Sequence, residues 1–99
     1  MIITKTQHNG SLTIALDGRM DITTAPDLER EIKNLDGGVT ELIMDFEKLI
    51  YISSAGLRVL LLAHKKMLKQ GGTMKVIHVG DLVMEVMKAM GFADILTIE

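Results

Sequence analysis

The chain has 99 residues, a formal net charge of −2 and no cysteine. That length suits one domain with one hydrophobic core, and a chain that is 47% hydrophobic and 24% charged has an ordinary globular composition. The weak negative charge and the scarcity of aromatic residues argue against nucleic-acid binding, which needs a basic face and stacking rings. The absence of cysteine excludes disulfides and thiolate chemistry.

The start of the chain does not have the architecture of a signal peptide. No apolar run approaches the roughly 18 residues that a membrane span needs. We therefore expect a cytoplasmic protein with no membrane span, made of a single domain over residues 1–99.

Two strands joined by a tight turn are predicted at the start of the chain. Residues 2–8 and 11–16 flank Asn9-Gly10, a dipeptide that favours a two-residue hairpin turn. In the second strand every other residue is strongly apolar, which predicts one buried face. These residues are Leu12, Ile14 and Leu16.

The first helix is predicted to begin at Thr24. Its hydroxyl can cap the free N–H groups of the first turn, with Asp27 three residues later as a variant of the capping box. Pro26 is tolerated in a first turn because its missing N–H would be unpaired there. Apolar residues follow at helical spacing, and Asp36-Gly37-Gly38 is expected to end the helix.

Strands and helices alternate over the rest of the chain. Glu41–Phe46 is densely apolar and predicts a short buried strand. The elements predicted after it are a helix over 54–70, a strand over Met74–Ile77, a helix over 81–90 stopped by Gly91, and a strand over Ile95–Ile98. The order β-β-α-β-α-β-α-β predicts an α/β fold: a mixed sheet whose later strands run parallel, with helices packed against it.

The sequence indicates no catalytic, metal or cofactor site. No His/Asp/Glu grouping has the spacing of a metal site, and no phosphate-binding loop of the GxxxxGK type is present. His8, His64 and His78 are isolated, and His64 falls in the apolar sector of the second helix, as a core or boundary residue does. A phosphocarrier role needs a reactive histidine at an exposed helix start, whereas His64 is in mid-helix. We therefore predict a binding domain rather than an enzyme.

The most informative segment is the start of the second helix, at Ser53 and Ser54. Either hydroxyl can cap the helix, as serine often does. Gly56 is harder to explain, because glycine in a first turn costs up to ~1 kcal/mol relative to alanine; a close approach by another backbone would account for it. The free N–H groups of a helix N-terminus also favour anions, so a phosphate on a serine here would be tolerated.

The segment Ile52–Val59 resembles the phosphorylation turn of the STAS-domain anti-sigma factor antagonists. The family pattern is commonly Asp, an acceptor Ser, Ser or Thr, and then Gly-Leu. The resemblance covers the whole chain and agrees with the predicted order of elements. Its other parts are residues 16–21 with 24–26, Gly71-Gly72 before a strand, and Met90-Gly91-Phe92 near the end.

The resemblance implies that Ser54 is the phosphorylation site. Ser53 is the alternative, because it stands where the family usually has an acidic residue. Asp21 matches the family's acidic position after the second strand and is a candidate partner contact; a turn or capping aspartate is the other interpretation. Arg58 replaces a small residue of the family pattern, and it lies one turn beyond Ser54, where it can reach a phosphate.

The function implied by the resemblance is partner switching. In the family, the unmodified domain binds an anti-sigma factor, often also its serine kinase, and so frees a sigma factor. Phosphorylation ends that binding, and a separate phosphoserine phosphatase restores it. STAS domains also occur as cytosolic subunits of lipid-transporting ABC systems and in stress-sensing scaffolds, and either alternative would keep the fold while changing the partner.

Helical wheels extend the expected partner-binding surface, which begins with Asp21, Ser53, Gly56 and Arg58. Leu62 falls within the polar sector of the second helix. Met84 lies opposite the apolar face of the third helix. We therefore expect Leu62 and Met84 to be exposed and to contact the partner.

Overall fold

The computed structural model describes residues 1–99 and contains one five-stranded sheet whose strand order, β1-β2-β3-β4-β5, follows the chain. β1 is antiparallel to β2, and β2, β3, β4 and β5 are mutually parallel. The strands are β1 (Ile2–His8), β2 (Ser11–Met20), β3 (Glu41–Ile52), β4 (Thr73–Ile77) and β5 (Thr97–Ile98). The predicted mixed α/β sheet is thereby confirmed.

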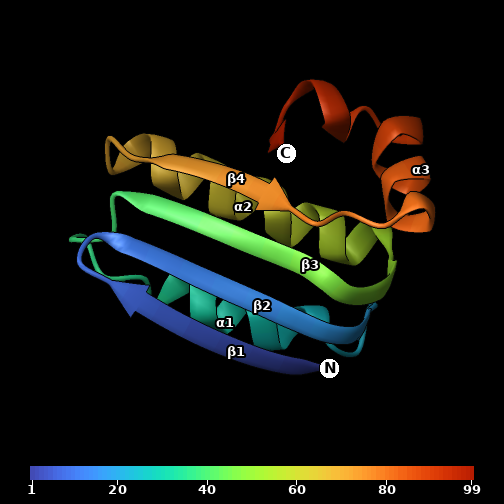
Figure 1. Ribbon diagram of the computed structural model, residues 1–99, viewed down its shortest axis with the longest axis horizontal. Helices are drawn as coiled ribbons and strands as arrows, with labels where there is room; N and C mark the ends of the chain where they lie inside the picture. Colours follow the sequence, from blue (N-terminus) through green and yellow to red (C-terminus); the bar gives the residue numbers. More distant parts are fainter.

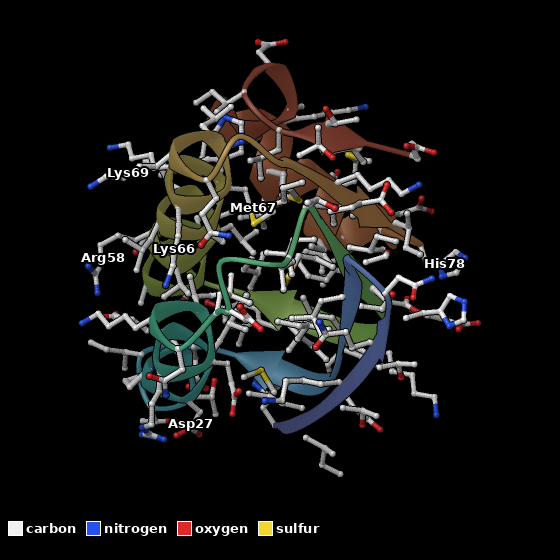
Figure 2. The ribbon with its side chains drawn as sticks, turned by 90° about the vertical axis from the view of Figure 1, so that its left-hand side faces the viewer. Asp27, Arg58, Lys66, Met67, Lys69 and His78 are labelled. Atoms are coloured by element: carbon white, nitrogen blue, oxygen red, sulfur yellow. The ribbon has the colours of Figure 1, made fainter.

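Helices α1 (Ala25–Lys33) and α2 (Ser54–Lys69) lie side by side on one face of the sheet, and the other face is left uncovered by them (Figures 1 and 2). Helix α3 (Asp81–Ala89) follows β4, and a short 3-10 helix, η1 (Phe92–Asp94), leads from α3 to the last strand (Figure 1). No helix has both the length and the apolarity that a membrane crossing requires.

The core lies between the sheet and these helices. Alternate residues of β2 and β3 point into it, as period-2 patterning requires. Twenty-three apolar residues form one connected buried cluster. The largest fully buried members include Ile14, Leu28, Ile32, Met44, Phe46 and Leu60.

The predicted hairpin turn at Asn9-Gly10 and the predicted helix stop at Gly91 are confirmed. Asn9 has a φ of 57°, the left-handed conformation that a primed hairpin turn demands. Gly91 follows α3 with a φ of 80°, which ends the helix at the predicted place.

The strands at the centre of the sheet are longer than predicted. β3 continues to Ile52 rather than stopping at Phe46, because its pairing with β2 resumes at Lys48 after a bulge, beyond the point where β4 ends. β2 follows β3 as far as Met20 through irregularities in register, one of them beside Gly18, whose φ is 114°. The last strand is shorter than predicted, because Ile95 belongs to the turn that closes η1.

The predicted cap of α1 is wrong. Thr24 precedes the helix but makes no side-chain cap, and its hydroxyl donates instead to the carbonyl of Arg19 at 2.8 Å. The carboxylate of Asp21 accepts from the backbone N–H groups of Thr23 at 2.9 Å and Thr24 at 3.2 Å. The side chain that binds N–H groups just before α1 is therefore that of Asp21, not that of Thr24. Asp27 pairs with Arg30 rather than completing a capping box.

Candidate functional site

The connection from β3 to α2 is direct, with one residue between strand and helix. Met20 at the end of β2 pairs with Ile52 at the end of β3, and the N–H of Ser53 donates to the carbonyl of Met20 at 2.9 Å. Ser53 is extended, and its hydroxyl accepts from the N–H of Gly56 at 3.4 Å. Ser53 is thus the N-cap of α2.

Ser54 is the first residue of α2, and its side chain is exposed. Because Ser53 caps the helix, the hydroxyl of Ser54 has no structural task and faces solvent at the positive end of the helix dipole. The two serines that the sequence left as alternatives therefore differ: one hydroxyl is committed to the helix, and the other is free to react or to contact a partner.

Gly56 is buried, and internal packing explains why it is glycine. A Cβ at this position would lie 2.8 Å from Cγ of Met20 and 2.9 Å from Cγ1 of Ile52. The predicted approach by another backbone is therefore wrong: the close neighbours are two side chains of this chain's own core. Gly56 lets α2 start directly against the ends of β2 and β3, which fixes where Ser53 and Ser54 lie.

Asp21 leaves the sheet beside Ser53, because the residues before them, Met20 and Ile52, are paired. Its side chain serves the local turn: the hydroxyl of Thr23 donates to it at 2.7 Å, in addition to two backbone N–H groups. These hydrogen bonds, the one from the Thr23 hydroxyl foremost, hold the pKa of Asp21 below its usual value. The carboxylate therefore stays charged next to the serine turn.

Sequence reasoning missed Ile22, which follows Asp21 and is 77% exposed. It is the most exposed large apolar side chain of the protein. The available signal was an isoleucine between two polar residues in a predicted connecting loop. Helical wheels and strand patterns do not apply to loop residues, so neither method singled it out. Its position beside Asp21 places an apolar contact at the edge of the serine turn.

Arg58 is exposed, and its side chain is already engaged in an ion pair. Its guanidinium pairs with Glu29 of α1 at 3.0 Å, and Glu29 also pairs with Lys33 at 2.9 Å. Lys33, and after it Arg58, lower the pKa of Glu29. The side chain of Arg58 extends outward from α2 on the side away from the sheet (Figure 2). It is one turn beyond Ser54 in the sequence, and its guanidinium is already paired with Glu29.

The helical wheels overestimated the exposure of Leu62 and Met84. Both are intermediate in exposure, and Leu62 packs partly against the core. Leu62 also borders a shallow hollow lined by Lys65, Lys66 and Lys69. The prominent apolar side chains on these helices are instead Leu68 of α2 and Leu82 of α3, which are 61% and 60% exposed. His64 is a boundary residue, as the wheel predicted.

The family of the chain follows from comparisons with known proteins. The STAS domain profile matches residues 3–99. The chain belongs to the STAS domain family. It is also 34% identical over 96 residues to BtrV of Bordetella bronchiseptica, whose name describes it as a candidate anti-sigma factor antagonist; the match covers 96% of this chain and 83% of BtrV. The resemblance to the anti-sigma factor antagonists is thereby confirmed.

Solved structures share the fold. An anti-sigma factor antagonist from Mycobacterium paratuberculosis superposes with a TM-score of 0.81 at 24% identity, over 98% of this chain and 83% of that one. The Bacillus protein SpoIIAA in its phosphorylated form superposes with a TM-score of 0.78 at 18% identity, over 99% of this chain and 91% of that one. At these identities the likeness establishes the architecture.

Proposed function

We propose that this STAS domain is an anti-sigma factor antagonist that works by partner switching in the cytoplasm. Its unphosphorylated form binds an anti-sigma factor that is also a serine kinase, and so frees a sigma factor. A phosphate on Ser54 ends the binding, and a phosphoserine phosphatase restores it. In this role the protein is a ligand and a kinase substrate rather than a catalyst.

The observation that carries the proposal is that the Ser53 hydroxyl caps α2 whereas the side chain of Ser54 is exposed. A kinase must remove the hydroxyl from any hydrogen bond that it makes in the fold, and only Ser54 offers a hydroxyl without a structural role. Ser53 would lose its cap on modification, because its oxygen accepts from the N–H of Gly56. Ser54 is therefore the modified residue in our proposal.

The docking stripe that we propose runs along the exposed side of α2 and consists of Ser54, Arg58, Leu62 and Lys65. These residues recur every three or four positions, so they share one side of the helix. Asp21 and Ile22 extend the surface past the N-terminus of α2. Ser53 supports it by capping the helix, and Gly56 by allowing the helix to pack closely. Met84 remains a further candidate contact on α3.

Helix α2, which carries the docking stripe, differs in charge from the rest of the chain. Helix α2 contains four cations, Arg58, Lys65, Lys66 and Lys69, and no carboxylate. The chain has 11 cationic and 13 acidic residues, so the chain outside α2 holds seven cations against 13 carboxylates, a net charge of −6. A partner that binds the docking stripe therefore carries carboxylates. A phosphoserine, with a charge of about −1.5 to −2, would repel those carboxylates.

The first test is modification of the protein by its cognate anti-sigma factor kinase and ATP, followed by mapping of the modified peptide by mass spectrometry. We expect phosphate on Ser54, and none on Ser54→Ala. Ser53→Ala is the matched control and should still be modified. Phosphate on Ser53 alone, or on neither serine, contradicts the assignment.

The second test concerns docking. Leu62→Glu should weaken binding of the anti-sigma factor at least tenfold, or ~1.4 kcal/mol, because it places a carboxylate within the stripe. Since Leu62 is partly buried, the thermal unfolding of Leu62→Glu must be followed, and Ile22→Glu, at a side chain that is 77% exposed, provides a second variant that should fold normally. Leu68→Glu is the matched control, because it makes the same change about 21 Å along α2 from Ser54. Equal binding by all variants, or capture of an ABC transporter ATPase in place of an anti-sigma factor, contradicts the proposal.

The third test asks how the switch acts. A phosphate at the N-terminus of α2 interacts favourably with the helix dipole, typically by ~0.3–1 kcal/mol. The phosphorylated protein should therefore melt at an unchanged or higher temperature while its affinity for the anti-sigma factor falls. Loss of helical circular dichroism on phosphorylation would show a conformational switch and would contradict an interface mechanism.

A further inference from the structure

Three potential metal ligands meet on the face of the sheet opposite to α1 and α2. Asp45 and Glu47 flank the buried Phe46 in β3, where a bulge interrupts the pairing with β2, and Asp45 is partly exposed and Glu47 exposed. Asp45 is paired with Ile77, the last residue of β4, so the next residue, His78, stands beside it. One ligand atom from each of the three side chains lies within 4.8 Å of the other two.

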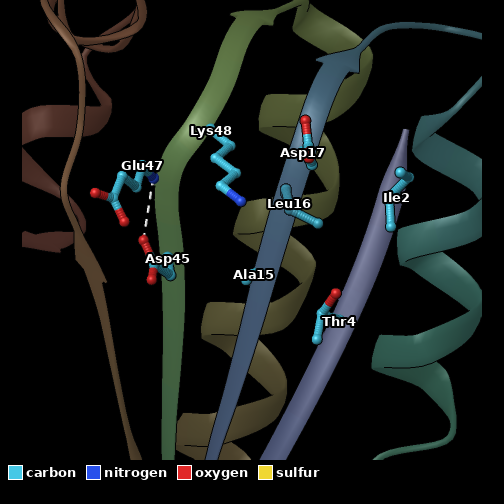
Figure 3. A pocket seen from close by; sticks show the side chains of 8 residues that line it. All are labelled: Ile2, Thr4, Ala15, Leu16, Asp17, Asp45, Glu47 and Lys48. Atoms are coloured by element: carbon cyan, nitrogen blue, oxygen red, sulfur yellow. Dashed lines mark hydrogen bonds between the residues drawn. The ribbon is translucent and has the colours of Figure 1, made fainter.

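The backbone orients this group. His78 has a φ of 58°, a left-handed conformation that turns the chain directly after β4. Its Nδ1 lies 2.9 Å from Oδ1 of Asp45. The N–H of Glu47 donates to the same oxygen at 3.0 Å, which fixes the rotamer of Asp45 and holds the Glu47 backbone beside it (Figure 3). Hydrogen bonds thus hold the imidazole to the Asp45 carboxylate and the Glu47 backbone beside them, while the Glu47 carboxylate lies near both without a hydrogen bond of its own.

We propose that Asp45, Glu47 and His78 form a site for a divalent transition-metal ion of the zinc class, with one imidazole nitrogen and two carboxylate oxygens as protein ligands and water in the remaining position. Three protein ligands with an open fourth position are a common zinc arrangement. Bonds of 2.0–2.2 Å in a tetrahedron place ligand atoms about 3.3–3.6 Å apart. Nδ1 and Oδ1, which share a hydrogen bond at 2.9 Å, would separate slightly to admit the ion, and the Glu47 carboxylate, within 4.8 Å of both, would move closer.

The donor set selects the class of ion. An imidazole nitrogen suits zinc, copper and nickel, whereas magnesium and calcium require oxygen ligands and more of them. Zinc is redox-inert and imposes no strong geometry, so a partly exposed site on a sheet surface accommodates it.

The surroundings leave room for the water ligand. A hollow of about 280 Å³ lies next to the two carboxylates and is also lined by Asp17 and Lys48. Asp17 adds negative potential to the hollow. The ammonium of Lys48 extends toward β2, away from Glu47 (Figure 3). The group shares no residue with the docking stripe, so its test does not depend on the proposed function.

The experiment is a titration of the full chain with zinc chloride in a non-chelating buffer, followed by calorimetry and by the imidazole NMR signals of the three histidines. We expect one-to-one binding that shifts the signals of His78 and leaves those of His8 and His64 in place. Magnesium chloride in the same titration should give no shift at His78, because the imidazole is a poor magnesium ligand.

Two variants test the ligands one at a time. Glu47→Gln removes a charge at an exposed position without changing shape, and His78→Asn removes the imidazole while tolerating the left-handed backbone. Each should weaken zinc binding at least ~10-fold, and His8→Asn should not change it. Zinc binding that is equal in wild type and in both variants, shifts at all three histidines together, or no binding at all would overturn the assignment.

Discussion

The substitution Gly56→Ala tests how the serine turn is built. The new Cβ would meet two core side chains at 2.8 and 2.9 Å, and a second atom of Met20, Cε, at 3.1 Å. Real Cβ atoms do not approach so closely, so Met20 or Ile52 must shift. Both are at most 1% exposed, and neither can move into solvent.

Two effects of opposite sign set the magnitude. Alanine is favoured over glycine within a helix by ~0.8–1 kcal/mol. Forcing an extra methyl into a well-packed core costs typically ~1–3 kcal/mol, and two contacts below 3.0 Å place Gly56→Ala in the upper part of that range. We therefore expect a net loss of about 1–2 kcal/mol in the free energy of unfolding, or a fall of roughly 4–16 °C in melting temperature for a domain of this size.

Urea denaturation with thermal unfolding measures the effect, and the chain offers a matched control. At Gly37 an added Cβ meets nothing within 4 Å, so Gly37→Ala should be neutral or stabilising by up to ~1 kcal/mol. In the double variant Met20→Ala, Gly56→Ala the contacts with Met20 are relieved while the one with Ile52 remains, so the combined loss should be smaller than the sum of the single losses. The reasoning is refuted if Gly56→Ala is as stable as wild type or if the two losses simply add.

Three further predictions concern individual side chains. Ser53→Ala should cost ~0.5–1 kcal/mol through loss of the cap, whereas Ser54→Ala should stay within ~0.5 kcal/mol of wild type; equal losses in chemical denaturation would contradict the assignment of the cap. The ammonium of Lys66 donates to the last two carbonyls of α1 at 2.8 and 3.0 Å, so Lys66→Met should destabilise by about 1 kcal/mol, while Lys69→Met should have no comparable effect. Because the pKa of Asp21 is lowered in the fold, its stabilisation is present above the unfolded value of 3.8 and is lost as the pH falls through the folded pKa. The stability difference between wild type and Asp21→Asn should therefore shrink below that pH, and a difference that is constant from neutral to acid pH would contradict it.

Periodicity within the chain was enough to predict the elements. The hairpin, the three helices and the parallel strands follow from the spacing of apolar residues and from turn residues such as Asn9 and Gly91, because these signals depend on neighbours a few positions away. The family resemblance came from the same local level, since the turn around Ser54 is a contiguous segment.

Local patterns failed where exposure depends on another element. A helical wheel shows which residues of a helix share a side, but it does not show how far a neighbouring helix reaches over that side. Leu62 was therefore predicted to be exposed and is partly covered. Likewise β3 was predicted to end at Phe46, before Glu47 and Lys48, although its pairing with β2 resumes at Lys48 and continues to Ile52 beyond the end of β4.

The sequence by itself determined the fold class, the order of elements and the segment that carries the proposed phosphorylation. Only the tertiary structure decided which of the two serines caps the helix, because that depends on how Ser53 is held against Met20. It also explained Gly56 and brought His78 to Asp45 across 33 residues. The cap, the close packing of Gly56 and the pairing of His78 with Asp45 share one physical reason. Each depends on a contact between different secondary-structure elements, and the register of the strands, rather than distance along the chain, determines which side chains meet.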